Sequence, residues 1–484
     1  MKEYKLYIDG KWVSSQSKKT FLSLNPANEK PIGKFQAGNS DDVEQAVEAA
    51  EKAFEQWSET PAPKRGEILF KVAALLRKNK ERLARLMTME MGKVIKEARG
   101  DVQEAIDIAE YMAGEGRRLF GFTTPSELKD KVCMTIRRPM GVVALITPWN
   151  FPIAIPAWKI MPALICGNTI VFKPSSDTPL CAIEFIKILE QAVPKGVINL
   201  VTGSAEDVGI PLIKHRKIKA ISFTGSRDSG RFVIENAGIK KVGLELGGKN
   251  PIIVMDDADL DLAVDGVIWG GYGTTGQRCT AASRVIVHKK IKSKFQELLV
   301  QRIRKLKVGD GLKKETDVGP LINQKAVEKT HSYIEVGQKE GARLAIGGQK
   351  IKGKGYFYEP TLFTDVICDM RIAQEEIFGP VVSLLEAEDL DEAIKIANSV
   401  SYGLSSSIYT SSIRNAWIAV QKIDAGLTYV NSSTIGSEAH LPFGGVKETG
   451  NGTREAGILG IDEFSEFKTV YFDYSGKLQK ATID

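Results

Sequence analysis

The sequence predicts an α/β protein with parallel sheets that are covered by helices on both faces. Two observations indicate this class. From residue 140 onward, short and fully apolar segments alternate with helical segments, and a second alternating region runs from residue 251 to about 430. Strands buried on both faces are continuous runs of Val, Ile and Leu, and their alternation with helices is typical of a doubly wound parallel sheet.

Length and charge limit the possible functions. A chain of 484 residues suggests about three units of core. The 66 basic and 60 acidic residues nearly cancel, leaving a net charge of +6. The basic cluster at residues 214–219 contains no aromatic residue, so it is interpreted as a solvated face, and we expect no nucleic-acid partner.

Neither a membrane nor a metal partner is expected. No segment approaches the roughly 18–20 uncharged apolar residues of a membrane span, and no signal peptide is evident at the N-terminus. The five widely spaced cysteines favour reduced thiols and a cytoplasmic location. Four histidines without a Cys-x-x-Cys or His-Glu-x-x-His motif indicate no metal site.

The N-terminal third begins with a hairpin and continues as helices. Residues 4–13 alternate around an Asp-Gly turn at 9–10, which predicts a tight hairpin. Helical periodicity extends from residue 41 to 120. Residues 122–139 interrupt it with Pro125 and alternating apolar side chains, which indicates an extended excursion.

The alternating region that follows predicts strands at residues 141–146, 168–172, 197–201 and 220–223, with a helix at 182–192. Further strands are predicted at 251–255 and 283–288. The segment 467–474 reads as an amphipathic strand after a glycine-rich loop.

Cys279 and Glu245 form the most informative pair of candidate residues. Cys279 stands in Gly-Gln-Arg-Cys-Thr (276–280) and Glu245 in Leu-Glu-Leu-Gly-Gly-Lys (244–249). A thiol nucleophile and a carboxylate that activates water are the groups needed to form and hydrolyse a thioester. Asn150, in Thr-Pro-Trp-Asn-Phe-Pro (147–152), offers an amide N–H to an oxyanion, although a turn role remains an alternative.

Two glycine-rich segments are candidates for phosphate binding. Residues 271–276 match Gly-x-Gly-x-x-Gly as a string, but they follow a helical run rather than a strand, so the dinucleotide fingerprint is rejected. Phe-Thr-Gly-Ser (223–226) follows a strand and precedes a helix that we expect to begin near Arg231. Such a turn can present N–H groups to an anion, although a plain β–α turn is equally open.

The combined motifs resemble the NAD(P)-dependent aldehyde dehydrogenase superfamily over essentially the full chain. Besides the motifs already quoted, the resemblance rests on Phe-Lys-Pro-Ser (172–175), Glu-Glu-Ile-Phe-Gly-Pro (375–380) and Pro-Phe-Gly-Gly (442–445). The resemblance implies a Rossmann-type cofactor domain, an α/β catalytic domain and a β oligomerisation flap. It also implies Cys279 as nucleophile, Asn150 as oxyanion donor and Glu245 as the base for thioester hydrolysis.

The resemblance also implies the cofactor and substrate residues. Those expected to contact the cofactor are Ile146, Thr147, Pro148, Trp149, Lys173, Ser175, Ser176, Gly225, Ser226, Leu246, Glu376 and Phe378. Those expected to line the aldehyde tunnel are Phe151, Trp158, Arg278, Thr280 and Phe443. Trp149, Phe151, Trp158 and Phe443 could instead be core aromatics.

The identity of the cofactor depends on Ser176. Relatives that prefer NAD commonly have a Glu at this position, which binds the adenosine ribose and repels a 2′-phosphate. The neutral Ser176, with Lys173 nearby, removes that repulsion. We therefore expect NADP to be accepted or preferred, and NAD to be used as well.

A semialdehyde is the first expectation for the substrate. Some succinic-semialdehyde relatives have an Arg where Trp158 stands, and that charge is missing here. Arg278 and His440 could instead meet an acidic group, while Arg278 could equally serve as a structural ion-pair partner. Residues 436–445 and 449–455 are similar to those of ketoglutarate-semialdehyde dehydrogenases.

Three parts and an oligomer are expected. The predicted parts are a cofactor-binding domain (1–120 and 140–247), a catalytic domain (248–447) and an oligomerisation or bridging segment (121–139 and 448–484). The last would pair with another subunit, which predicts a homodimer or homotetramer. The alternatives are a CoA-acylating aldehyde dehydrogenase, which Glu245 disfavours, and a non-catalytic structural member of the fold.

Overall fold

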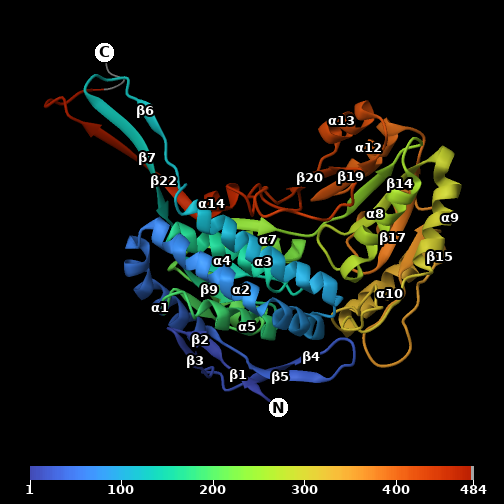
Figure 1. Cartoon of the computed structure of the whole chain (residues 1–484), viewed down its shortest axis with the longest axis horizontal. Coiled ribbons are helices and arrows are strands. Elements are labelled where there is room, and N and C mark those ends of the chain that lie inside the picture. The colour runs from blue at the N-terminus through green and yellow to red at the C-terminus, as the bar shows by residue number, and fades with distance from the viewer. Residues whose placement is uncertain (481–484) are drawn as a thin grey trace.

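The computed structural model describes residues 1–480 and contains two seven-stranded sheets, with a smaller sheet projecting from the body (Figure 1). In the first large sheet the strand order is β12-β11-β8-β9-β10-β2-β3. Neighbours from β12 to β10 run parallel, whereas β2 and β3 are antiparallel additions. The bounds are β2 Leu6–Ile8, β3 Lys11–Val13, β8 Val142–Ile146, β9 Thr169–Lys173, β10 Ile198–Leu200, β11 Ile218–Thr224 and β12 Lys241–Glu245.

The predicted hairpin at the N-terminus is confirmed. Strands β2 and β3 pair across Asp9 and Gly10, whose φ angles of 51° and 71° suit a type I′ turn. The neighbouring three-stranded sheet β1-β5-β4 was not predicted. Its strands are short and exposed along one face, with bounds Glu3–Tyr4 for β1, Thr20–Leu24 for β4 and Pro31–Gln36 for β5.

Helices cover the first sheet, as the doubly wound pattern requires. Three of them fill the predicted helical region: α1 Ser40–Glu59, α2 Ala62–Met91 and α3 Ile95–Glu115. The others lie between strands: α4 Ala154–Cys166, α5 Pro179–Leu189, α6 Ile210–Lys214 and α7 Arg227–Ala237. Helix α5 starts three residues before the predicted helix because Pro179 occupies its first turn. Helix α7 starts at Arg227, not near Arg231, because Ser226 caps it.

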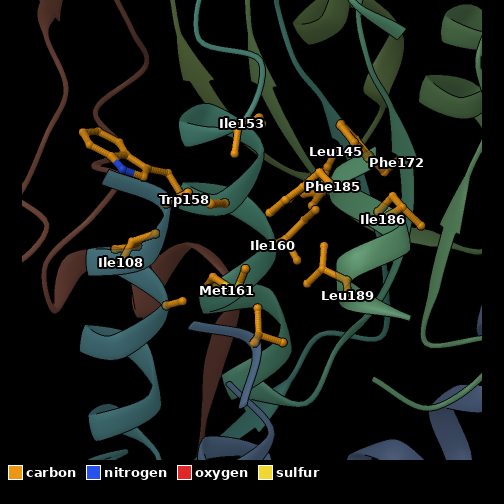
Figure 2. Close-up of a cluster of buried hydrophobic side chains, with 14 of the residues drawn as sticks. Ile108, Leu145, Ile153, Trp158, Ile160, Met161, Phe172, Phe185, Ile186 and Leu189 are labelled. Carbon is orange, nitrogen blue, oxygen red and sulfur yellow. The ribbon is translucent and has the colours of Figure 1, made fainter. Parts of the chain in front are cut away.

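One of the two core clusters of this half lies between α4, α5 and the sheet. Figure 2 shows Ile160 and Met161 of α4 packed beside Phe185 and Leu189 of α5. Trp158 also belongs to α4, but its indole points away from that cluster, on the side where Ile108 of α3 is drawn. Helix α4 is buried almost all round, which agrees with a sequence that is apolar apart from Lys159.

The second large sheet has the order β15-β16-β17-β14-β13-β19-β20, and only β15 runs antiparallel to its neighbour. Its strands are β13 Asn250–Val254, β14 Ala282–His288, β15 Arg343–Ile346, β16 Thr361–Thr364, β17 Val381–Ala387, β19 Ser405–Tyr409 and β20 Leu427–Val430. Its helices are α8 Leu260–Tyr272, α9 Lys292–Ile303, α10 Gln324–Lys339, α11 Arg371–Gln374, α12 Leu390–Asn398 and α13 Ile413–Lys422. A two-stranded pair, β18 Tyr402–Gly403 and β21 Val446–Lys447, lies apart from this sheet.

Residues 271–276 are no dinucleotide fingerprint, as predicted. They cover the end of α8 and the 3₁₀ turn Gly273–Gly276, and no strand precedes them. Thr274 and Thr275 have positive φ angles of 51° and 60°. This strained turn leads directly to Cys279.

The projecting sheet, here called the flap, joins segments far apart in the sequence (Figure 1). It consists of β6 Thr123–Pro125, β7 Lys131–Pro139 and β22 Ser465–Asp473. Strand β22 pairs antiparallel with the whole of β7, from Ser465 opposite Pro139 to Asp473 opposite Lys131. Both predicted extended segments are therefore confirmed, and helix α14 Leu459–Glu463 leads into β22.

Within residues 1–480, no helix has both the length and the apolarity needed to cross a membrane. The proposed domain boundaries remain a prediction. The two sheets lie within the cofactor and catalytic ranges, and β6, β7 and β22 lie within the bridging range.

Candidate active site

Cys279, Glu245 and the predicted tunnel residues meet in one pocket. Glu245 is the last residue of β12, and Cys279 follows the 3₁₀ turn Gly273–Gly276. The pocket wall contains Phe151, Trp158, Arg278, Thr280 and Phe443, all five of the residues expected to line the tunnel. It also contains residues that sequence reasoning missed: Glu104, Ala154, Ile155, Thr224, Gly436, Ser437 and Glu455.

Cys279 is held by its backbone and surrounded by carboxyl groups. Its carbonyl oxygen accepts a hydrogen bond of 2.7 Å from Asn250 Nδ2. Burial raises the pKa of the Cys279 thiol to about 12, and Glu245 and Glu376 add to the effect. The thiol is therefore the stable form until a positive charge enters the site.

Asn150 follows β8 and is aimed at the loop that carries Cys279. Its Nδ2 donates a hydrogen bond of 3.0 Å to the carbonyl oxygen of Gln277, and its side chain is buried. Among the described residues, Asn150 Oδ1 has no hydrogen-bond partner. The second N–H of this amide is free to donate to an oxyanion formed beside Cys279.

Glycines allow the backbone to approach the reactive groups. A Cβ added at Gly248 would collide with the Cys279 carbonyl oxygen, and one at Gly247 would collide with the Glu376 carboxylate. A Cβ at Gly444 would meet Glu245 Oε1. The glycines of the two motifs are therefore required by close packing around the site, in addition to the turns they permit.

Glu245 belongs to a buried group of charges that motifs did not reveal. Lys159 of α4 is fully buried, and its Nζ donates to Glu455 Oε1 and, at 2.7 Å, to Ser222 Oγ. Burial raises the pKa of Glu245 well above its usual range, and Glu455 raises it further. The sequence carried one signal of this group, since Lys159 interrupts an otherwise apolar helix.

Arg278 faces the pocket and also pairs with a buried acid. Its Nε donates to Thr274 Oγ1 at 2.8 Å, and its Nη2 lies 3.6 Å from Glu97 Oε1. The guanidinium also lies 5.2 Å from the ring centroid of Phe151, whose ring lies 3.6 Å from Lys93 Nζ. The structural ion pair anticipated for Arg278 is thus present, without removing the side chain from the pocket wall.

An acidic outer cavity adjoins the pocket and shares Glu104, Trp158 and Ser437 with it. Its wall further contains Asp107, Glu110, Tyr111, Glu438, Ala439 and His440. His440 lies 3.5 Å from Glu438 and is more than half exposed, so it does not line the inner pocket.

Most of the predicted cofactor residues gather at the carboxyl ends of β8, β9, β11 and β12. Ile146 and Lys173 end two neighbouring strands. Ser226 caps α7 with its hydroxyl, so the first N–H groups of that helix are presented beside Gly225. The remaining residues at the ends of these strands are Thr147, Pro148, Trp149, Ser175, Ser176 and Leu246.

Glu376 and Phe378 reach the same region from the second sheet. Glu376 Oε1 accepts a hydrogen bond of 3.0 Å from the Gly248 N–H. Phe378 has a positive φ of 60° and packs edge-on against Trp149, with ring centroids 5.5 Å apart. The ring of Phe378 thus connects the segment before β17 with the segment after β8.

These groups suit a dinucleotide. The buried hydroxyl of Thr147 has no hydrogen-bond partner within residues 1–480. Lys173 Nζ contacts only the Pro174 carbonyl oxygen, at 3.2 Å, among the hydrogen bonds of that range. Burial lowers the pKa of Lys173 to about 8, and Glu206 and Asp177 partly oppose this shift. A capped helix N-terminus, a buried cation and a carboxylate match a pyrophosphate and ribose hydroxyls.

Comparison with known proteins identifies the family. A family model described as "Aldehyde dehydrogenase family" matches residues 12–470. The chain belongs to the aldehyde dehydrogenase family. It is accordingly an oxidoreductase that oxidises an aldehyde with NAD(P).

Among similar proteins, the alpha-ketoglutaric semialdehyde dehydrogenase of Bacillus subtilis is 44% identical, covering 97% of this chain and 98% of that protein. The 2,5-dioxopentanoate dehydrogenase of Saccharolobus solfataricus is 41% identical, covering 97% and 99%. The solved structure of betaine aldehyde dehydrogenase from Staphylococcus aureus in complex with NAD+ has a TM-score of 0.96 and 37% identity, covering 99% and 97%. The predicted fold class is thereby confirmed.

Within the described part of the chain, no group of three or more His, Cys, Asp or Glu side chains is arranged to hold a metal ion. The carboxyl groups near Glu245 instead face a lysine.

Proposed function

We propose that this enzyme oxidises a short semialdehyde bearing a carboxylate, of the 2-oxoglutarate semialdehyde type, to the dicarboxylic acid. The observation that carries the proposal is the place of Arg278, the only cationic side chain among the described residues of the pocket wall. Arg278 adjoins Cys279 in sequence. A substrate whose carboxylate binds the Arg278 guanidinium would therefore extend its short carbon chain across the pocket toward the thiol. The names of the two semialdehyde relatives support this choice.

Acylation begins at Cys279. Its thiolate adds to the aldehyde carbon, and the carbonyl oxygen becomes an oxyanion. The free N–H of Asn150 and the Cys279 backbone N–H donate to that oxygen, because Asn150 is already directed at the Cys279 loop. Phe151 and Trp158 limit the space around the carbon and exclude water at this stage.

A bound nicotinamide would supply the hydride acceptor that oxidation of the tetrahedral carbon requires. Gly225 and Ser226 would hold the pyrophosphate, Lys173 and Glu376 the ribose hydroxyls, and the Trp149–Phe378 pair would pack near the nicotinamide. The chain then carries a thioester on Cys279. Glu245 takes a proton from water, whose oxygen adds to the thioester carbon and releases the acid and Cys279.

The choice between NADP and NAD depends on Ser176. We propose that NADP is accepted, because no carboxylate stands at position 176 to repel a 2′-phosphate. The Ser176 hydroxyl donates to the Gly203 carbonyl oxygen at 2.9 Å, which fixes its orientation. Glu206 faces Lys173 and supplies an opposing negative charge, so NAD use is expected as well.

A second candidate substrate is a cationic aldehyde. The acidic side chains of the outer cavity, Glu104, Asp107, Glu110 and Glu438, would attract a positive group at the pocket mouth. The structural match named a betaine aldehyde dehydrogenase agrees with that chemistry. Arg278 lies in the wall of the inner pocket and is next to Cys279 in sequence, so it favours an anionic substrate.

An aldehyde panel decides between these substrates. Initial rates with NAD and with NADP are measured for 2-oxoglutarate semialdehyde, succinic semialdehyde, betaine aldehyde and pentanal. The proposal expects the highest kcat/KM for a carboxylate-bearing aldehyde, while a preference for betaine aldehyde would overturn it. Product analysis with and without CoA excludes the acylating alternative, since hydrolysis must yield the free acid. The Cys279→Ala variant should lose at least about a thousandfold in activity, and retained turnover would reject the mechanism.

We further propose a homodimer or homotetramer in the cytoplasm, assembled through the flap. Exposed apolar side chains support this proposal, since Tyr471 is 69% and Phe472 63% exposed on β22. A sheet edge and apolar patch of this kind usually mark an interface.

A further inference from the structure

Glu463, at the end of α14, carries a buried carboxyl group that the proposed reaction does not use. Its side chain is 5% exposed, and neither carboxyl oxygen has a hydrogen-bond partner within the described residues. An isolated buried carboxylate is costly, so such a group normally has a donor or a charge beside it.

The position of this carboxyl group places it near Glu245. A Cβ added at Gly243 would collide with Glu463 Oε1, so the carboxyl lies against β12 two residues before Glu245. Ser222 of β11 is its polar neighbour, and the Ser222 hydroxyl also accepts from Lys159 Nζ at 2.7 Å. Glu463 is not among the residues of the substrate-pocket wall, which contains Glu245 and Glu455.

The buried charges do not balance if all groups are ionised. Glu245, Glu455 and Glu463 are within 5% of complete burial, and Lys159 of α4 is the ammonium group bonded among them. The positive charge of Lys241 of β12 lowers the pKa of Glu463. The Lys241 ammonium group itself donates to the carbonyl oxygens of Asp462 and Ser465. Similarly, the charge of Arg454 lowers the pKa of Glu245, while the guanidinium donates to the Thr453 carbonyl oxygen. Three acids thus compete for one buried cation, and a proton on one alters the proton affinity of the others.

We propose that Glu463 is a positioning residue for thioester hydrolysis, because its carboxyl group determines the pH range in which Glu245 can activate water. This inference rests on the proposed role of Glu245 as the base. Burial raises the pKa of Glu463 to about 7, and Lys159 opposes the shift. Above that pH the ionised Glu463 repels charge on Glu245, so the base form of Glu245 becomes less favourable as Glu463 ionises.

The test is the pH profile of hydrolysis in Glu463→Gln. Rapid mixing with aldehyde and cofactor separates a burst of NAD(P)H, which reports acylation and hydride transfer, from the later steady rate, which reports hydrolysis when a burst is present. Between about pH 5 and pH 9 the acid limb of the steady rate should move to lower pH by roughly one unit. The pH dependence of the burst should be the same as in the parental enzyme.

Two variants separate charge from structure. Glu463→Asp retains the acid and should keep the parental profile, whereas Glu463→Leu removes it and should reproduce the shift. The leucine variant also serves if the glutamine variant fails to fold, because an apolar side chain of similar size needs no hydrogen-bond partner at a buried site. Glu235→Gln, at an exposed position on α7, is the matched control and should change nothing.

An unmoved acid limb in both neutral variants overturns the proposal, even if their overall rates fall. Failure of the proposed function has a different signature. If Glu245 is not the base, Glu245→Gln retains hydrolysis, and if CoA is the acceptor, the steady rate depends on CoA.

Discussion

Arg278 Nη2 lies 3.6 Å from Glu97 Oε1, while the same guanidinium forms part of the pocket that contains Cys279. Glu97 in turn accepts hydrogen bonds of 3.0 Å from the Thr274 N–H, within the strained turn before Cys279. One carboxylate thus anchors both the pocket cation and the turn that leads to Cys279. A role in substrate binding and a role in structure are therefore compatible for Arg278.

Substituting Arg278 should separate these roles. Because a hydrogen bond to a charged group contributes about 1.5–3 kcal/mol, Arg278→Gln should raise KM for a carboxylate-bearing aldehyde roughly tenfold to hundredfold. The KM of pentanal should change much less. The measurement is the ratio of kcat/KM for the two aldehydes.

Removing Arg278 also leaves Glu97 buried without its counter-charge, which should lower the melting temperature. The double variant Glu97→Gln/Arg278→Gln removes both charges and should regain part of that loss without restoring selectivity. Unchanged selectivity in both variants would contradict carboxylate recognition by Arg278.

Introducing a carboxylate at Ser176 should change the cofactor preference. Ser176→Glu places a negative charge where a 2′-phosphate is expected, so kcat/KM with NADP should fall by about tenfold or more relative to NAD. Ser176→Gln has the same size without the charge and should leave the ratio closer to that of the parent. A similar ratio in both variants would mean that charge at this position does not select the cofactor.

The reactivity of Cys279 should depend on pH and on the cofactor. Because the pKa of the thiol is raised to about 12, the thiolate fraction at neutral pH is small and grows as pH rises toward that value. Alkylation of the cofactor-free enzyme by iodoacetamide should therefore accelerate about tenfold per pH unit between pH 7 and pH 9. Mass spectrometry of the Cys279 peptide separates this reaction from labelling of Cys133 and Cys368, which are partly exposed.

Adding NAD(P) should increase the alkylation rate at neutral pH, since a positive nicotinamide ring favours the thiolate. A pH-independent rate without cofactor would show that the thiolate is already formed.

Charge on the flap should disrupt assembly. Phe472→Glu places a carboxylate on the exposed face of β22, and light scattering should then report a smaller species than the parental oligomer. Phe70→Glu on α2 changes a comparably exposed aromatic side chain of the body and should leave the mass unchanged. A monomeric parent would refute the proposed oligomer.

The sequence predicted the parts of the fold that depend on local patterns. Strands β8, β9, β10, β11 and β13 contain buried apolar runs, so their positions could be predicted directly, whereas β12 was not predicted. Strands β4 and β5 were missed because they are short and partly exposed. Helices α5 and α7 begin several residues before their predicted starts, because Pro179 and Ser226 determine their first turns.

The residues of the site also differ in whether a local sequence pattern reveals them. Cys279, Glu245 and Asn150 could be proposed from the sequence because each lies in a motif. The predicted pocket residues Trp158 and Phe443 lie together in the structure, with ring centroids 5.1 Å apart. Glu455, Ser222 and Glu463 could not be found, since their proximity to Lys159 is created only by the tertiary fold. A single lysine in an apolar helix shows that a partner exists without showing which one.

The flap has a consequence for the order in which the molecule can form. Arg137 of β7 donates to the hydroxyl of Ser465 at the start of β22, 328 positions later in the chain. During synthesis β7 can pair with β6, but its other edge must wait for β22 while both large sheets are made. Closure of the flap is necessarily a late event, so a nascent chain can complete most of its pocket before the surface proposed for assembly has formed.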